Sequence, residues 1–132
     1  MYKIEKKPYG FKLTFGGFIR NDEMQQWVEE SKKALEKSPS KFGVFIDMRE
    51  LKPLPSSSQE YMQEGQKIYR EKGMQRSVVI LDNPGTTLQF KRLAKETGIK
   101  KRERYIDAST VEDWLVKGLN WIKHAEEPDR PE

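Results

Sequence analysis

The sequence predicts an α/β domain built on a mixed sheet, and three features of its 132 residues support this fold class. Two short alternating segments near the start are separated by turn residues, which indicates an antiparallel hairpin. Apolar segments of strand length and amphipathic segments of helix length then alternate along the chain, as in parallel strands joined by crossover helices. We expect one domain of about five strands and about four helices over residues 1–125, followed by a mobile tail over 126–132.

In the first half of the chain, the pattern changes from two strands to a helix and then to a buried strand. The first two strands alternate apolar and polar side chains on either side of Pro8-Tyr9-Gly10. The helix has apolar residues at helical spacing, Asn21 or Asp22 as its expected cap and Ser38-Pro39 as its end. The third strand is uniformly apolar, which suits a strand covered on both faces, and a loop over 48–55 follows it. The three predicted strands cover residues 2–6, 11–15 and 42–47.

A second helix and a fourth strand follow. The helix covers residues 56–72 and stops at Gly73, a residue suited to the left-handed backbone position after a helix. The apolar residues 78–81 form the strand, and Asp82-Asn83-Pro84-Gly85 after it has the composition of a turn.

The last third of the chain repeats the order of helix, strand and helix. The predicted helix over 87–97 is closed by Gly98, and residues 102–107 give the weakest strand pattern. Ser109 or Thr110 is the expected cap of the final helix. The apolar face of that helix is predicted to consist of Val111, Trp114, Leu115, Gly118, Leu119 and Ile122.

Composition excludes several classes of function. Charged residues make up 35% of the chain, well above the roughly 25% of an ordinary globular domain. The chain has no cysteine, which rules out disulfides and thiolate chemistry. Its first residues lack the apolar stretch of a signal peptide, and no segment approaches the roughly 20 apolar residues of a membrane span. We therefore expect a cytoplasmic protein.

The net charge of +4 is concentrated in one segment, residues 91–104. Seven bases and two acids give this segment a charge of +5, so the rest of the chain is close to neutral. Such a cluster could contact an anionic membrane surface, although a solvated helix face is the preferred interpretation. Nucleic acid is disfavoured because no recognised motif or interleaved aromatic residues accompany the bases. The candidate contact residues are Lys91, Lys95, Lys100, Lys101 and Arg102.

The sequence contains few residues and motifs that could carry out catalysis. The only histidine, His124, lies beside the predicted tail, and no serine-hydrolase or zinc-protease motif occurs. Asp47, Asp82 and Asp107 each close a predicted strand, at the edge where open α/β sheets collect ligands. Together they could hold Mg²⁺ for hydrolysis or phosphoryl transfer, but the preferred interpretation is that each begins a turn. We expect no enzyme activity, no cofactor and no resident metal.

Large apolar residues in the predicted helices leave open a site for a small apolar ligand or a lipid. Trp114 and Trp121 share a helix face with Gly118 between them, which could leave a gap. Phe90 on the preceding helix is a further candidate for the lining. Packing of these residues against the sheet is the competing interpretation.

The serine run Ser56, Ser57 and Ser58 stands at the predicted start of a helix. Unpaired backbone N–H groups and the helix dipole would stabilise a phosphate there, so the run could act as a switch. The spacing from Ser56 to Gln59 and from Ser57 to Glu60 also fits capping boxes, in which the serines only cap the helix.

The stretch Phe45 to Ser58 resembles the signature of STAS domains, the fold of bacterial anti-sigma-factor antagonists and of sulfate-transporter C-terminal regions. In that family a buried strand ends in an acidic residue, and a short loop leads to Asp-Ser-Ser-Gly at a helix start. Here Pro55 and Ser58 stand where the family has Asp and Gly. Residues 69–73 and 93–99 also resemble the family's helix-to-strand joints, and the order of elements is similar over residues 1–123.

The resemblance implies a non-catalytic regulatory module that mediates protein–protein interaction in bacterial signalling. By position, Ser57 is the serine that a partner kinase would phosphorylate. The expected partner-binding surface combines the helix start at 56–58 with the loop that holds Asp82, Asn83 and Thr86. The departures from the signature also resemble a looser branch that is similar to both STAS domains and Sec14-type lipid carriers, which implies lipid binding as the alternative. The sequence leaves the partner and homodimer formation open.

Overall fold

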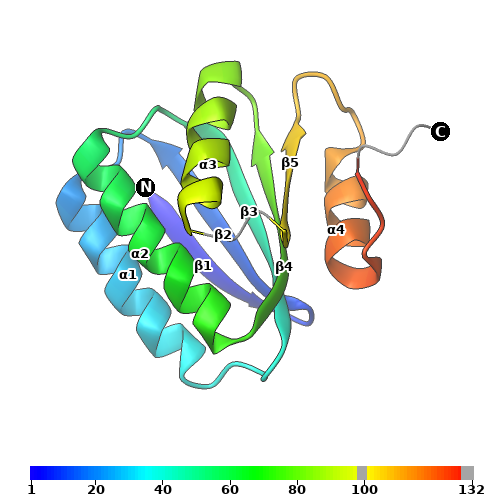
Figure 1. Cartoon of the computed structure of the whole chain (residues 1–132), viewed down its shortest axis with the longest axis horizontal. Helices are drawn as coiled ribbons and strands as arrows, with labels where there is room; N and C mark the ends of the chain where they lie inside the picture. Colours follow the sequence, from blue (N-terminus) through cyan, green and yellow to red (C-terminus); the bar gives the residue numbers. More distant parts are fainter. Residues whose placement is uncertain (98–100, 129–132) are drawn as a thin grey trace.

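The computed structural model describes residues 1–97 and 101–128 and has the predicted α/β fold (Figure 1). Five strands form one sheet in the order β1-β2-β3-β4-β5. β1 (Tyr2–Lys7) and β2 (Gly10–Gly17) form the expected antiparallel hairpin, and all later neighbours in the sheet are parallel. The remaining strands are β3 (Phe42–Leu51), β4 (Met74–Leu81) and β5 (Glu103–Asp107). The prediction of a mixed five-stranded sheet with four helices is confirmed.

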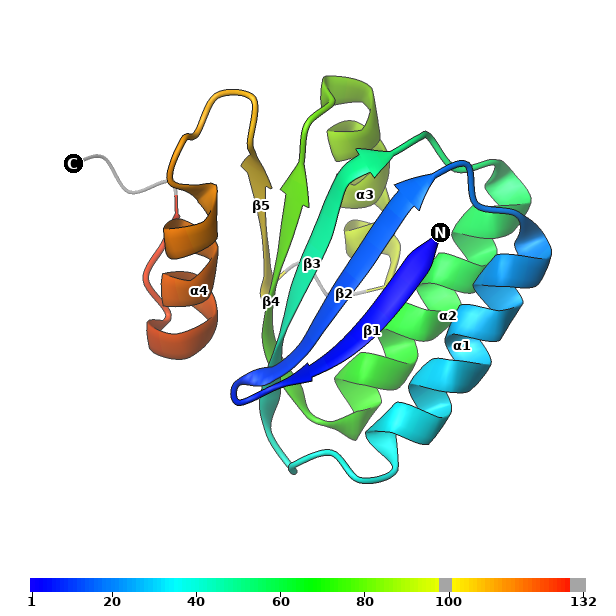
Figure 2. The ribbon, with the colours of Figure 1, turned by 180° about the vertical axis from the view of Figure 1, so that it is seen from behind.

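Three helices cover one face of the sheet, and the fourth packs on the other (Figures 1 and 2). The strands from β2 to β5 follow one another across the sheet in chain order. Right-handed crossovers that always advance in one direction return over the same face, which places the first three helices together. The last helix contacts β3, β4 and β5 from the other face. The helices are α1 (Asn21–Leu35), α2 (Ser56–Lys72), α3 (Pro84–Thr97) and α4 (Trp114–His124).

The sheet separates two apolar clusters. The larger one lies under α1, α2 and α3 and contains Trp27 and Phe90, whereas the smaller one lies under α4 and contains Phe45. Glycines allow the closest helix contacts on both faces. A Cβ at Gly65 would overlap the ring of Trp27, and a Cβ at Gly118 would lie 2.7 Å from the ring of Phe45. Neither helix could pack at its present distance with a larger residue there.

β3 is longer than predicted. We expected it to end at Asp47 and to give way to a loop over 48–55, but it continues to Leu51. Asp47 lies inside the strand, in register with Thr14 of β2 and Ile80 of β4. The strand continues because Met48 and Leu51 still reach the core, with 2% and 4% of their surface exposed. The predicted turn at Asp47 is therefore wrong.

The starts of α1 and α2 differ from the predicted caps. The residues that precede the two helices are Arg20 and Pro55, and neither makes a side-chain cap hydrogen bond. The predicted cap at Asn21 or Asp22 and the two capping boxes of the serine run are therefore wrong. The end of α2 matches the prediction, because Gly73 has a φ of 119° and a ψ of 17°.

The last two helices also begin away from their predicted positions. α3 starts at Pro84, since proline suits the first turn of a helix and Asn83 Oδ1 accepts a hydrogen bond from the Thr86 N–H at 3.0 Å. The predicted closure of α3 by Gly98 lies outside the described residues. α4 starts at Trp114 instead of near Ser109, so Leu115 is 47% exposed and does not join the apolar face as predicted.

The described part of the predicted tail is packed on the domain. Both carboxylate oxygens of Glu127 accept hydrogen bonds from the Arg104 guanidinium, each at 2.8 Å. Pro128 is buried. Residues 129–132 of the predicted tail lie outside the described part of the chain.

Candidate functional site

The starts of the three crossover helices meet at the edge of the sheet where the parallel strands end (Figure 2). Hydrogen bonds join the first two. Asn21 of α1 donates through Nδ2 to Ser57 Oγ at 3.1 Å, and its Oδ1 accepts from Ser58 Oγ at 2.7 Å. The serine run is therefore held against α1 by a side chain that the sequence analysis assigned to capping.

The third helix start is joined to the same surface through the β3–α2 loop. Gln89 of α3 accepts a hydrogen bond from the Leu54 N–H at 3.2 Å and donates to the Leu54 carbonyl at 2.8 Å. Gln59 of α2 donates to the same carbonyl at 2.9 Å. We call this connected surface the rim. It consists of the exposed residues Phe18, Arg20, Asn21, Ser56, Ser57, Asp82, Asn83 and Leu88.

The rim presents most, but not all, of the predicted partner-binding residues. Ser56 and Ser57 are exposed, whereas Ser58 is only 1% exposed and cannot reach a partner. In the second loop, Asp82 is exposed and Asn83 both caps α3 and reaches the surface. Thr86 is also 1% exposed, so it supports the loop from inside.

Two large apolar side chains on the rim were missed by the sequence analysis. Phe18 is 80% exposed and Leu88 is 69% exposed. Each of them departs from the apolar pattern of its neighbours in the sequence. Phe18 lies between two core positions but does not fit their periodicity, and Leu88 lies off the helical stripe of Phe90 and Leu93. The chain turns outward before Phe18 at Gly17, which has a φ of 68°.

The three candidate aspartates do not form a metal site among the described residues. Asp47 is paired with Arg49, whose Nε and Nη2 donate to its carboxylate at 3.0 and 2.9 Å. Burial alone would raise the pKa of Asp47, but the hydrogen bonds and the charge of Arg49 outweigh burial and hold that pKa below its usual value. Asp107 accepts a hydrogen bond from the Ser109 N–H at 2.9 Å, as expected for an acid that begins a turn.

The four residues proposed for an apolar ligand do not share a pocket. Phe90 lies under the three-helix layer, on the opposite face of the sheet from α4. The space at Gly118 is filled by Phe45, and Trp121 Nε1 donates to the Ser77 carbonyl at 2.9 Å. Trp114 packs against the Arg49 guanidinium, 4.2 Å from its ring centre. These contacts favour the packing interpretation of the tryptophans.

A small internal cavity lies elsewhere, between the sheet and the helices α1 and α2. It has a volume of about 20 Å³ and is lined by residues that include Trp27, Met62 and Tyr69. This volume holds about one water molecule. Pockets for small organic ligands usually measure roughly 300–1,000 Å³.

A fully buried acid was not predicted. Glu103 on β5 accepts hydrogen bonds from Ser77 Oγ at 3.0 Å and from Tyr105 Oη at 2.6 Å. Burial raises the pKa of Glu103 to about 7, although both hydrogen bonds act to lower it. Burial and the neighbouring Glu103 charge in turn raise the pKa of Tyr105. In the sequence this acid is hidden between Arg102 and Arg104 and is indistinguishable from a surface charge.

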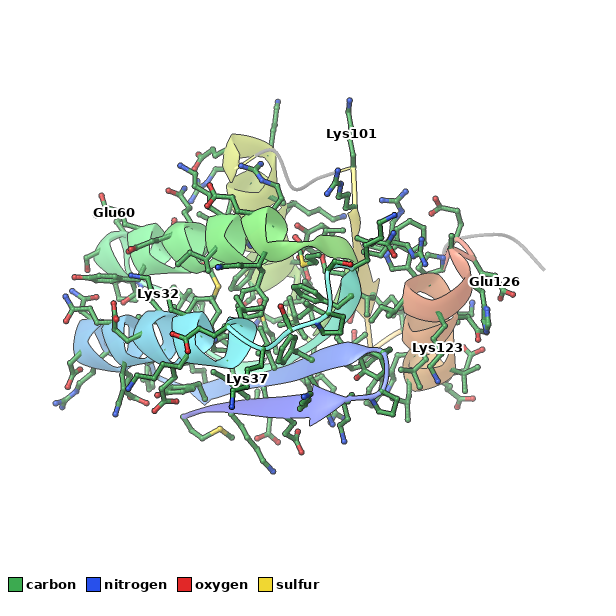
Figure 3. All side chains as sticks on the ribbon, turned by 90° about the horizontal axis from the view of Figure 1, so that it is seen from below. Lys32, Lys37, Glu60, Lys101, Lys123 and Glu126 are labelled. Carbon is green, nitrogen blue, oxygen red and sulfur yellow. The ribbon has the colours of Figure 1, made fainter. Side chains whose placement is uncertain are left out.

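The predicted anionic contact surface is exposed where the structure describes it. Lys91 and Lys95 are exposed on α3. Lys101 extends into solvent before β5 (Figure 3). Arg102 is exposed as well, with its Nη1 donating to the Met74 carbonyl at 3.3 Å, and Lys100 lies outside the described residues. Among the helices of the described segments, none has the length and apolar character to cross a bilayer.

Comparison of the chain with family models, with curated proteins and with solved structures found no match. The likeness to STAS domains therefore stays a prediction from the sequence. Two surfaces of the described chain could contact a partner: the rim, and the basic face of α3 and β5.

Proposed function

We propose that this chain is a non-catalytic regulatory module of STAS-like fold that binds a partner protein through the rim. The observation that carries the proposal is the exposure of Phe18 and Leu88, at 80% and 69%, on a surface whose helix starts are fixed by hydrogen bonds. Exposed large apolar residues at a rigid, polar-rimmed surface are typical of protein-binding sites.

The arrangement of the rim supports a protein partner. α2 contacts both α1 and α3, so its serine run lies between the segment with Phe18 and the helix with Leu88. The apolar side chains supply anchors that a partner can bury, and Ser57 and Asp82 supply polar groups around them. The hydrogen bonds between the helix starts reduce the entropy lost when a partner binds.

Regulation at Ser57 is part of this proposal. Its Oγ is exposed, within hydrogen-bond distance of Asn21, and no acidic side chain occupies the first turn of α2. A phosphate on this oxygen would place negative charge between the two apolar anchors and would compete for the Asn21 amide. The resemblance to STAS domains, in which a serine at this position is phosphorylated, supports the same role.

A quantitative pull-down tests the proposal. The baits are the wild-type chain, Phe18→Ser, Ser57→Asp and Val116→Ser, incubated with extract of the source organism. Val116 is the matched control, because it is an apolar residue 57% exposed on α4, away from the rim. We expect one or more proteins that are retained by wild type and Val116→Ser, and lost with Phe18→Ser and Ser57→Asp. Identical protein lists for all four baits would contradict binding through the rim.

The lipid-binding alternative has a separate test. An apolar ligand of fatty-acid size would require α1 and α2 to move away from the sheet, since the cavity beneath them measures only about 20 Å³. Mass spectrometry of the gently purified chain under native conditions would reveal a bound lipid. We expect the mass of the polypeptide alone.

A further inference from the structure

A second surface of the molecule has a different chemistry from the rim. An open groove with a volume of about 520 Å³ lies between α3 and β5. Cationic side chains from both elements line it, and Tyr105 and the buried Glu103 complete the lining. We call it the basic groove. Its cationic residues are Lys91, Arg92, Lys95 and Arg104.

The acids closest in sequence leave the charge of the three α3 cations uncompensated. Glu96 accepts a hydrogen bond from Gln63 of α2 at 2.6 Å, which directs its carboxylate away from β5. Glu103 lies inside the fold and is hydrogen-bonded to Ser77 and Tyr105. Within the described residues, neither acid forms an ion pair with a base of the groove. The groove therefore attracts anions.

A carboxylate already occupies Arg104, whose side chain lies on the α4 side of the edge strand β5, beside the basic groove. Arg104 holds Glu127 through two parallel hydrogen bonds of 2.8 Å, the geometry in which guanidinium recognises a carboxylate most strongly. The guanidinium also stacks on the ring of Trp121, 4.2 Å from its centre, and this contact fixes its plane. Glu127 comes from the segment after α4, so an acidic peptide of the chain itself is seated at this position.

We propose that the basic groove binds an acidic segment of a partner protein that extends over the edge strand β5 to Arg104, a position that Glu127 occupies in the free chain. The proposal is independent of partner binding at the rim. A carboxylate seated on Arg104 favours a peptide over a membrane, since the lining of the groove contains no aliphatic side chain that could insert into a bilayer. Tyr105 offers a base little free ring surface, because Lys91 Nζ already lies over its ring, 6.0 Å from the centre.

Fluorescence anisotropy tests this binding. The probe is a labelled peptide of about ten residues that alternates glutamate with glycine, and the uncharged probe alternates glutamine with glycine. The variant Lys91→Glu/Lys95→Glu reverses two charges of the groove. Its matched control is Lys33→Glu/Lys37→Glu, two exposed lysines with the same spacing in and just after the last turn of α1. Lys37 is labelled in Figure 3. Thermal melting confirms that both double variants are folded.

We expect the acidic probe to bind at low salt and the uncharged probe not to bind. Reversal at Lys91 and Lys95 should weaken the affinity at least tenfold, the control pair should change it less than twofold, and Glu127→Gln should tighten it by releasing Arg104. Added salt should weaken binding, because charges at an open surface are screened. Equal affinity of the two double variants would overturn the proposal. So would tight binding of phosphatidylserine vesicles or single-stranded RNA by a chain that does not bind the acidic peptide.

Discussion

The rim includes the start of α3, and the basic groove lies between the same helix and β5. The two surfaces differ in chemistry, so one fold offers two kinds of recognition. At the rim, neutral side chains satisfy one another, as Asn21 does with Ser57 and Ser58, and two apolar residues are left exposed. At the groove, cations converge over a buried acid, Glu103. We expect rim binding to depend on apolar burial and to resist salt, and groove binding to depend on charge and to weaken with salt.

The largest predicted effect concerns the acid beneath the groove. The pKa of Glu103 is about 7 in the folded chain and 4.5 in an exposed reference state. Between these values the folded chain holds a proton that the unfolded chain has released, so stability falls as pH rises through this window and is level above it. The loss amounts to about 3 kcal/mol in the free energy of unfolding.

Urea unfolding of wild type and Glu103→Gln at several pH values from about 4.5 to about 8 measures this effect. The difference between the two profiles isolates Glu103, since all other groups titrate in both. We expect the free energy of unfolding of Glu103→Gln to increase relative to that of wild type as pH rises. Parallel pH profiles would show that Glu103 is not a buried acid that titrates in this range, and would contradict the account of the acid beneath the groove.

An intermediate effect is predicted for the joint between the first two helices. Asn21→Ala removes the partner of the Ser58 hydroxyl, which is 1% exposed, and should lower the free energy of unfolding by about 1–2 kcal/mol. Gln25→Ala is the matched control, because its amide bonds to Tyr61 across the same helix pair at an exposed position. The Gln25→Ala substitution should lower the free energy of unfolding by about 0.5 kcal/mol or less. Equal decreases in the free energy of unfolding for the two variants, measured by chemical denaturation, would indicate that the Asn21 hydrogen bonds do not stabilise the rim more than an exposed contact does.

The smallest effect on stability should come from the residue with the largest predicted effect on binding. Phe18→Ser removes a side chain that is 80% exposed, so the free energy of unfolding should change by about 0.5 kcal/mol or less. Thermal denaturation checks this. A loss above about 2 kcal/mol would place Phe18 among the core residues and remove it from the binding surface.

Local sequence patterns predicted the helices and strands better than they predicted which residues of different elements lie close together. Gly73 identified the end of α2, and alternation identified the hairpin, because each depends on backbone conformation and nearby residues. The strand order was not in the pattern, and it places Phe90 and Trp114 on opposite faces of the sheet. The two residues had been assigned to one ligand site for lack of this information.

The site residues show the same limit. Ser58 and Thr86 were predicted at the surface from their places at helix starts, but a partner on another helix or the packing of the turn buries each of them. Glu103 was counted with the charged surface, because burial beside Ser77 depends on the register of β4 and β5. Phe18 and Leu88 could have been found from the sequence by asking which apolar residues fail to fit the predicted stripes.

The most direct measurement for binding at the rim is photo-crosslinking from single positions. A photoreactive amino acid replaces Phe18 in one chain and Val116 in another, and each chain is irradiated in extract of the source organism. Binding at the rim predicts a covalent adduct with one defined protein from position 18 and none from position 116. Capture of the same protein with equal yield from both positions, or only from position 116, would contradict it.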